Sequence, residues 1–449
     1  MLATLAVAAV ALAAPVPRDQ TVRLRWSASP AEARSGRFLG ETDIAFALNT
    51  SAAVDVWKHL GGEALAMLSE DSVAVLQRSQ AEIEVVEVLM DDVGAVVASQ
   101  AASRQASFSA NSSARGAESG TLGPFFDDFR DLASVYEYME LLHLEHPERT
   151  RFFPNIGPSY QGTPIKAIEI GGVDGGPSVY IQATSHSREW ISTSTAMAFV
   201  DELLNTEDEQ LRRLVEEIRW TIVPVLNPDG YEFTFSSDPQ GRMWRKTRSP
   251  NEGSECIGTD LNRNYDDHWG GEGIPTPLPD CASTDPCSNS YRGDSVWSEP
   301  EAAAVRDFLP QVAGGSLPGS LVGLLDLHSF GQMFNRPYGW VNPAELVPPN
   351  NEATALCAEN MVDAIESTTG ASYISQFGFE LYPTCGTGMA YMYNVSFPSG
   401  TVYTVELRDT GAFGFLLPPE EIRPTATEMV AGLKVYGEHV LSQWRKRNS

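Results

Sequence analysis

Reactive side chains follow three apolar runs of this sequence directly. His186 and Glu189 come after the run 178–183, His328 follows the run 321–327, and Glu406 lies near the end of the run 401–407. Such runs predict strands buried on both faces, and in an open α/β sheet reactive groups gather just past the carboxyl ends of strands. Two histidines and a carboxylate leave zinc an open fourth position, which is typical of a catalytic site. The sequence therefore predicts one zinc ion per chain, held by His186, Glu189 and His328, with Glu406 as the base that takes a proton from water.

Each of these signals is weak when it is taken alone. A His-x-x-Glu pair occurs often by chance, and a glutamate after a strand is usually a solvated chain end. The zinc-site interpretation rests on the fact that three separate strand ends all present the residue types that such a site needs. The sequence holds no His-Glu-x-x-His pattern of single-helix zinc proteases and no Gly-x-Ser-x-Gly of serine hydrolases.

Basic residues form a second group inside a very acidic chain. One cluster is Trp244-Arg245-Lys246-Thr247-Arg248, and Arg263 follows within Asp260–Asp266. A guanidinium is a planar, permanently charged fork that suits a carboxylate. Residue types alone leave two readings open, a pocket for an anionic substrate group and a set of surface salt bridges.

The surrounding pattern alternates strand-like and helix-like segments from Phe125 to the end. It predicts an α/β domain with a mixed, largely parallel sheet flanked by helices. A small α+β unit precedes it, in which Thr21–Trp26 and Ile83–Leu89 read as strands and Val54–Leu68 has helical spacing. The expected helices of the larger domain are Ser194–Leu204, Ser298–Leu309, Asn351–Ser367 and Glu420–Trp444.

The N-terminal region reads as a signal peptide followed by a pro-domain. Residues 1–14 are rich in Ala, Val and Leu, but the run is about 15 residues, shorter than the ~20 of a spanning helix. Residues 98–123 are mostly Ser, Ala, Gly and Asn, which predicts a linker, and Arg104 and Arg115 in it are expected targets for an activating protease. We therefore expect a signal peptide at 1–14, a pro-domain with linker at 15–115 and a catalytic domain at 116–449.

The composition limits which binding partners and which cellular compartment we expect. The net charge of −28 disfavours nucleic acid and anionic membrane surfaces. The five cysteines form no Cys-x-x-Cys pair, so in a secreted chain they predict disulfides with one thiol left over. We expect a secreted, extracellular monomer that binds neither nucleic acid nor membrane.

The motifs together resemble the pro-enzyme zinc metallocarboxypeptidases of the pancreatic A/B type. The resemblance covers nearly the whole chain after the signal peptide, although it is weaker over residues 18–115, which look like the family's inhibitory pro-domain. It rests on segments in the family's order and at similar spacing: His186–Glu189, Trp244–Arg248, Asn262–Asn264, His328-Ser329 and Glu406–Gly411.

The resemblance implies zinc-dependent hydrolysis of the last peptide bond of peptides or proteins. His186, Glu189 and His328 would bind zinc, as their types and positions already indicate. Glu406 would be the general base and later the proton donor. Arg248 would stabilise the oxyanion that forms as water adds to the carbonyl.

The same resemblance assigns the substrate contacts. Asn262 and Arg263 would hold the terminal carboxylate, which makes the enzyme an exopeptidase because an internal peptide bond offers no such group. Tyr382 would close over the substrate. Arg188 and Arg245 would line the path toward the next residue inward.

Specificity is expected to come from the base of the side-chain pocket. Aligned through Gly386–Tyr391, that position is Met389, an apolar residue that favours aliphatic or aromatic C-terminal residues. The family usually has Asp-Trp where this chain has Ala390-Tyr391, and Asn335 and Phe377 also fall near the pocket. Basic or acidic preference therefore stays an alternative, as does a non-catalytic protein of this fold that binds C-termini.

The resemblance also implies one disulfide, Cys256–Cys287. Cys281, Cys357 and Cys385 have no assigned partner. Cys385 lies three residues after Tyr382, so a bond there would stiffen the closing loop.

Overall fold

The computed structural model describes residues 19–26, 44, 48, 55–60, 63–78, 83–111, 122–238, 241–274, 276, 278, 281–317, 319–396 and 400–449. The expected signal peptide lies outside these residues. The chain divides into two compact units, Met1–Val96 and Val97–Ser449. No helix in the described ranges is long and apolar enough to cross a membrane.

Among its described residues, the first unit holds a four-stranded antiparallel sheet and helix α2. Its strands are β1 (Asp19–Trp26), β2 (Asp55–Leu60), β3 (Glu63–Ser69) and β4 (Ile83–Met90), in the order β2-β3-β1-β4, and α2 spans Glu70–Arg78. The helix predicted over Val54–Leu68 is wrong, because the described residues of this stretch form β2 and β3, which pair antiparallel. Ala64, Ala66 and Leu68, at every second position, pack into the core of this unit, and this strand period decides the structure over the apparent helical spacing.

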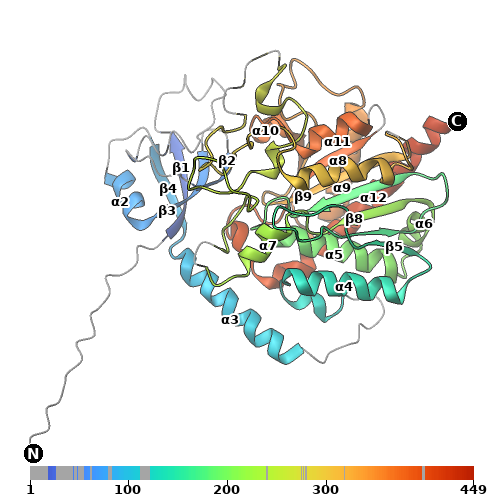
Figure 1. Cartoon of the computed structure of the whole chain (residues 1–449), viewed down its shortest axis with the longest axis horizontal. Helices are drawn as coiled ribbons and strands as arrows, with labels where there is room; N and C mark the ends of the chain where they lie inside the picture. The colour runs from blue at the N-terminus through green and yellow to red at the C-terminus, as the bar shows by residue number, and fades with distance from the viewer. Residues whose placement is uncertain are drawn as a thin grey trace, which may run out of the picture. The chain divides into compact units, whose positions relative to one another are not determined.

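The second unit is built on an eight-stranded mixed sheet (Figure 1). Its order is β11-β10-β12-β9-β7-β8-β6-β5, with the four central strands β12, β9, β7 and β8 parallel. The predicted fold class is therefore confirmed. The strands are β5 (Thr150–Phe153), β6 (Ala167–Ile170), β7 (Ser178–Ala183), β8 (Arg219–Val223), β9 (Leu321–Ser329), β10 (Met333–Arg336), β11 (Ile374–Phe377) and β12 (Thr401–Leu407).

Helices cover this sheet, and all four predicted helices are confirmed as α5, α8, α9 and α12. Figure 1 shows α4 and α5 side by side, as their packing contacts require. The helices are α4 (Leu132–Glu145), α5 (Trp190–Asn205), α6 (Glu209–Glu217), α7 (Pro228–Thr234), α8 (Pro300–Val312), α9 (Asn351–Thr369), α10 (Gly378–Leu381), α11 (Gly388–Ser396) and α12 (Ile422–Asn448), with short 3₁₀ turns η2 (Pro124–Asp127), η3 (Leu261–Arg263), η4 (Trp269–Gly271), η5 (Gly414–Leu416) and η6 (Pro419–Glu421).

The two faces of the larger sheet differ in chemistry. Ile181, Leu325 and Val405 belong to a large apolar core with α4, α5, α9 and α12. The alternating residues face the other way, where Tyr180, Leu324 and Val402 pack with α8 and α11. His328 and Glu406 continue this second set along β9 and β12, so the chemistry lies on the α11 side of the sheet.

The segment expected to be a linker from residue 98 is instead helical up to Asn111. Helix α3 spans Val93–Asn111. The scarcity of large apolar residues suggested a linker, but the alanines of this segment give it a high helix propensity. Arg104 lies on this helix, half-buried, with its guanidinium 4.6 Å from the ring centre of Trp190 and 5.2 Å from that of Phe235. Arg115 lies outside the described residues.

Candidate metal and substrate site

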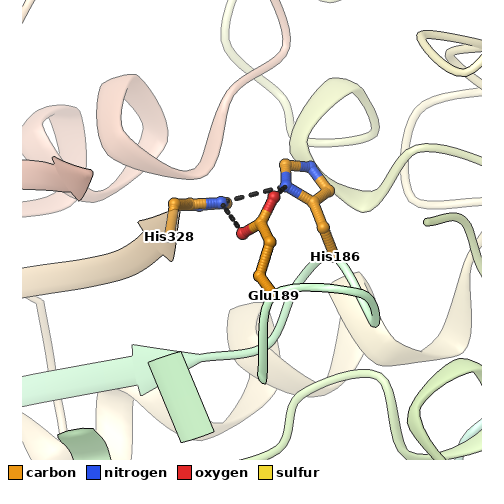
Figure 2. A group of neighbouring side chains, drawn as sticks. All are labelled: His186, Glu189 and His328. Atoms are coloured by element: carbon orange, nitrogen blue, oxygen red, sulfur yellow. Dashed lines mark hydrogen bonds and ion pairs between the residues drawn. The ribbon is translucent and has the colours of Figure 1, made fainter. Parts of the chain in front are cut away.

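The three predicted metal ligands come together in the folded chain. His186 lies in the loop after β7, Glu189 immediately precedes α5, and His328 is near the carboxyl end of β9. Figure 2 shows the three side chains pointing at one another from these elements. The parallel pairing of β7 with β9 places the two strand ends side by side, which is why residues 142 positions apart meet.

The geometry suits a small divalent cation. His186 Nδ1 lies 2.7 Å from Glu189 Oε1, His328 Nδ1 lies 3.1 Å from Glu189 Oε2, and the two Nδ1 atoms are 3.0 Å apart. One ligand atom from each residue falls within 4.8 Å of the others, and all three side chains are buried. Two imidazole nitrogens and a carboxylate are the donor set of open zinc sites, so these residues fit the metal that the sequence predicts.

A second carboxylate stands behind each histidine. His186 Nε2 lies 3.0 Å from Asp260 Oδ1, and His328 Nε2 lies 3.1 Å from Asp326 Oδ2. Both aspartates are completely buried, and such outer carboxylates fix the orientation of metal-binding imidazoles. Sequence reasoning gave neither aspartate a role, although the position of Asp326 two residues before His328 on one strand places both on the same face.

The local charges suit a cation between the histidines. Burial alone would raise the pKa of Glu189, but His186 and His328 hold it well below its usual value. Burial disfavours a charged His328, yet Asp326 and Glu189 raise its pKa. Each imidazole is thus held between two carboxylates, an environment rich in negative charge.

The structure places the two arginines of the basic cluster in different surroundings. Arg245 Nη1 lies 3.7 Å from Glu189 Oε1, and its Nη2 lies 2.8 Å from Asp260 Oδ2. Arg248 is not brought to the metal ligands, because its guanidinium packs over the rings of Phe233 and Trp244 at 3.7 and 4.4 Å. The two arginines are three residues apart in a segment without regular structure, so their spacing did not reveal which one faces the site.

The path of this segment explains why Arg245, and not Arg248, lies beside the candidate metal ligands. The Ser187 N–H donates to Arg245 O at 3.1 Å, and Ser187 Oγ donates to Trp244 O at 2.7 Å. The segment is therefore attached to the loop that carries His186. Burial would lower the pKa of Arg245, but the neighbouring carboxylates, Asp260 above all, raise it. The guanidinium therefore stays cationic.

The predicted carboxylate-binding residues lie next to this centre. Arg263 Nη2 donates to the Tyr382 hydroxyl at 3.2 Å, and Arg263 Nη1 lies 3.9 Å from Asp260 Oδ2. Asn262 Oδ1 accepts from the Gly388 N–H at 2.8 Å, which attaches the start of α11 to the same region. Met389 follows in the first turn of α11 and is 3% exposed.

Glu406 is on the strand next to the metal ligands. In the parallel pairing of β12 with β9 it lies directly beside His328, and in the antiparallel pairing with β10 it lies beside Met333. It is partly exposed, whereas the three candidate ligands are buried. Glu406 and the candidate ligand His328 therefore share one face of the sheet.

Arg188 follows His186 by two residues but faces a different environment. Its guanidinium lies 4.1 Å from the ring centre of Phe415, and Nη1 donates to Met243 O at 3.5 Å. The side chain is almost completely buried. These contacts do not test its expected contact with substrate, which stays a prediction.

Two disulfides frame the site. Cys256–Cys287 is present as the resemblance implied, and the structure adds Cys281–Cys385. Cys357 is a free, buried thiol in α9. The second bond anchors the segment between Tyr382 and Met389 to the loop of Cys281, where the Cys385 N–H also donates to Cys281 O.

Comparisons with known proteins agree with this geometry. The zinc carboxypeptidase family model matches residues 135–432. Carboxypeptidase A1 of Bos taurus is 34% identical over 320 residues, 70% of each chain, and a metallocarboxypeptidase A-like protein of Trichophyton verrucosum is 33% identical over 71% of each. The crystal structure of thrombin activatable fibrinolysis inhibitor matches with a TM-score of 0.77 and 26% identity over 95% of this chain and 99% of its own. The crystal structure of carboxypeptidase A from Helicoverpa armigera matches with a TM-score of 0.75 and 25% identity, over 95% of this chain and 98% of its own.

Proposed function

The chain belongs to the zinc carboxypeptidase family, and on that premise we propose a secreted pro-enzyme that removes single neutral residues from peptide C-termini. The observation that carries the proposal is the convergence of His186, Glu189 and His328 beside Glu406 on one face of the sheet. A protein that only binds C-termini would have no need of this full set.

The metal site and the base have separate tasks. Zinc held by His186, Glu189 and His328 would supply a Lewis acid for the scissile carbonyl and for water. Glu406 accepts the proton of the attacking water and delivers it to the departing amine. Its partial exposure suits a group that must exchange protons with water and substrate.

Arg245 takes the oxyanion role in this proposal. Its guanidinium is held at the metal ligands by Asp260 and is 11% exposed, so its charge is fixed before substrate arrives. A preorganised cation of this kind stabilises charge that develops only in the transition state. Arg248 packs on aromatic rings elsewhere and has no such position.

Asn262, Arg263 and Tyr382 would recognise the terminal carboxylate. Arg263 Nε is buried without a hydrogen-bond partner among the described residues, so this guanidinium retains a donor for a substrate oxygen. Tyr382, whose hydroxyl accepts from Arg263, would close over the bound residue. An internal peptide bond has no carboxylate for this group, which limits the enzyme to chain ends.

The side chain of the departing residue would be chosen by the region around Met389. This thioether belongs to the apolar cluster between the sheet and α11. A charged substrate side chain placed there would lose hydration without a counter-charge, whereas aliphatic and aromatic residues gain from burial. We therefore propose A-type preference, with Arg188 lining the path inward.

Residues 1–14 would direct secretion, and the segment up to about residue 115 would be a pro-domain removed by a protease. The two disulfides suit an oxidising compartment. We propose that the activating cut falls after helix α3, because Arg104 is half-buried within it.

The test is amino-acid release from blocked dipeptides by the full-length chain, before and after brief trypsin treatment stopped with a serine-protease inhibitor. The substrates end in Phe, Leu, Lys or Glu, and each assay is repeated with a zinc chelator. We expect chelator-sensitive release of Phe and Leu that increases after trypsin. Release of Lys or Glu instead would keep the chemistry and overturn the preference. No release from a chain with confirmed zinc would favour a non-catalytic binding protein.

A further inference from the structure

Asn335 lies on the catalytic face of the sheet. In the antiparallel pairing of β10 with β12, Asn335 is opposite Thr404 and Met333 is opposite Glu406. Residues directly opposite each other in such a pair have side chains on the same face. Phe334, between them in sequence, belongs to the core on the other face. Asn335 is thus two residues along β10 from Met333, the residue that pairs with Glu406.

The same row crosses five strands and consists entirely of polar residues. Thr404 pairs with Asp326 of β9, which pairs with Gln182 of β7, and on its other side Asn335 pairs with Gln376 of β11. Asp326 of this row stands behind His328, and Gln182 Nε2 donates to Asp326 at 3.0 Å, so these two polar residues belong to the surroundings of the candidate metal site. The polar residues toward β10 and β11, Asn335 and Gln376, are the ones left to meet a substrate.

The amide of Asn335 has an unused donor. Its side chain is 2% exposed, and Oδ1 accepts from Gln376 Nε2 at 3.0 Å. Gln376 Nε2 also lies 3.3 Å from Met333 Sδ, so its donor end faces this strand and Asn335 Oδ1 is the acceptor. Asn335 Nδ2 is then buried with no hydrogen-bond partner among the described residues. Such a donor is costly unless a ligand satisfies it.

The charges around this donor favour a neutral ligand. On strands β9 to β12, the charged groups on this face are the carboxylates Asp326 and Glu406 and the candidate ligand His328, and the two carboxylates disfavour a third. Arg336 is next along β10 but faces the other side, with its guanidinium over Phe377. A substrate carboxylate would therefore meet no cation in this row, whereas a carboxamide oxygen can accept from Asn335 Nδ2 at no charge cost.

We propose that Asn335 makes the enzyme recognise C-terminal residues with a side-chain amide, glutamine and asparagine, among its neutral substrates. This inference rests on the proposed carboxypeptidase function and refines its specificity. The carboxylate-binding group and Met389 are linked through the bond of Asn262 to Gly388, so the departing side chain is presented between α11 and this face of the sheet.

The experiment compares glutamine with methionine, a neutral side chain of similar length and shape. kcat/KM is measured on blocked dipeptides ending in Gln, Met or Glu with the trypsin-activated full-length enzyme and with Asn335→Leu. We expect the wild type to cleave Gln at least as well as Met and both far better than Glu. In Asn335→Leu the Gln/Met ratio should fall about tenfold, because one hydrogen bond to a buried donor is lost.

Two further variants make the result decisive. Asn448→Leu places the same substitution at an exposed site in the last turn of α12 and should leave the ratio unchanged. Asn335→Asp keeps the side-chain volume while it removes the donor, so it should also lower Gln turnover if the leucine variant fails to fold. An unchanged Gln/Met ratio in both Asn335 variants, or a wild-type preference for Glu over Gln, overturns the inference. Absence of release from every substrate contradicts the proposed function instead.

Discussion

Replacing Arg245 with methionine should slow turnover sharply while zinc stays bound. The guanidinium lies 3.7 Å from Glu189 and 2.8 Å from Asp260, and it is 11% exposed, so its charge is poorly screened by solvent. Losing one preorganised group that stabilises an oxyanion costs about 2.7–4 kcal/mol in comparable sites, or roughly 10²–10³ in kcat. The methionine keeps the apolar stem, so the loss reports on the charge.

Arg248→Met is the matched control. Its guanidinium stacks over Phe233 and Trp244 and makes no described contact with the metal ligands, so kcat should stay within about threefold of wild type. The assay measures kcat and KM on a blocked dipeptide ending in Leu, together with zinc per chain. Zinc is counted because Arg245 also holds Asp260, the carboxylate behind a ligand. A large kcat loss in Arg248→Met with normal turnover in Arg245→Met would refute the reassignment.

Three further outcomes follow from particular contacts. Asp326→Asn should weaken zinc affinity roughly 10–100-fold in a chelator competition because Asp326 orients His328, and unchanged affinity would remove that role. Burial raises the pKa of Glu301 to about 8, so its contribution to stability is complete below the unfolded value of 4.5 and is lost as the pH rises toward 8. Glu301→Gln should therefore flatten the fall in Tm between pH 5 and 8, and an equally steep fall would contradict this assignment. N-terminal sequencing after brief trypsin treatment should find a start after Arg115 and not after Arg104, which is stacked on two aromatic rings, whereas early cleavage at Arg104 would show that the stacking gives no protection.

The sequence predicted the parts of the fold that depend on long apolar runs. Strands β7, β9 and β12 are buried on both faces, so their hydrophobicity is unmistakable, and their carboxyl ends locate His186, His328 and Glu406. The four-residue strands β5, β6, β10 and β11 were missed, because so short a run carries too little periodic signal.

Other features depend on tertiary contacts that the sequence pattern does not reveal. Val54–Leu68 fits a helical spacing, but the antiparallel pairing of β3 with β1 and with β2 makes its described residues strands. The choice between Arg245 and Arg248 depends on the path of an irregular segment, which Ser187 fixes from another part of the chain. The partner of Cys385 depends in the same way on a loop 104 residues away.

The catalytic role of Glu406 at the zinc site is tested by Glu406→Gln in the full-length, trypsin-activated enzyme, with zinc content and amino-acid release measured on the same sample. Glu420→Gln, at an exposed position, is the control. We expect zinc to stay at one per chain while release of Leu falls by about 10²–10⁴, because the carboxylate that moves the protons is gone. Wild-type release from the zinc-loaded Glu406→Gln variant would contradict it.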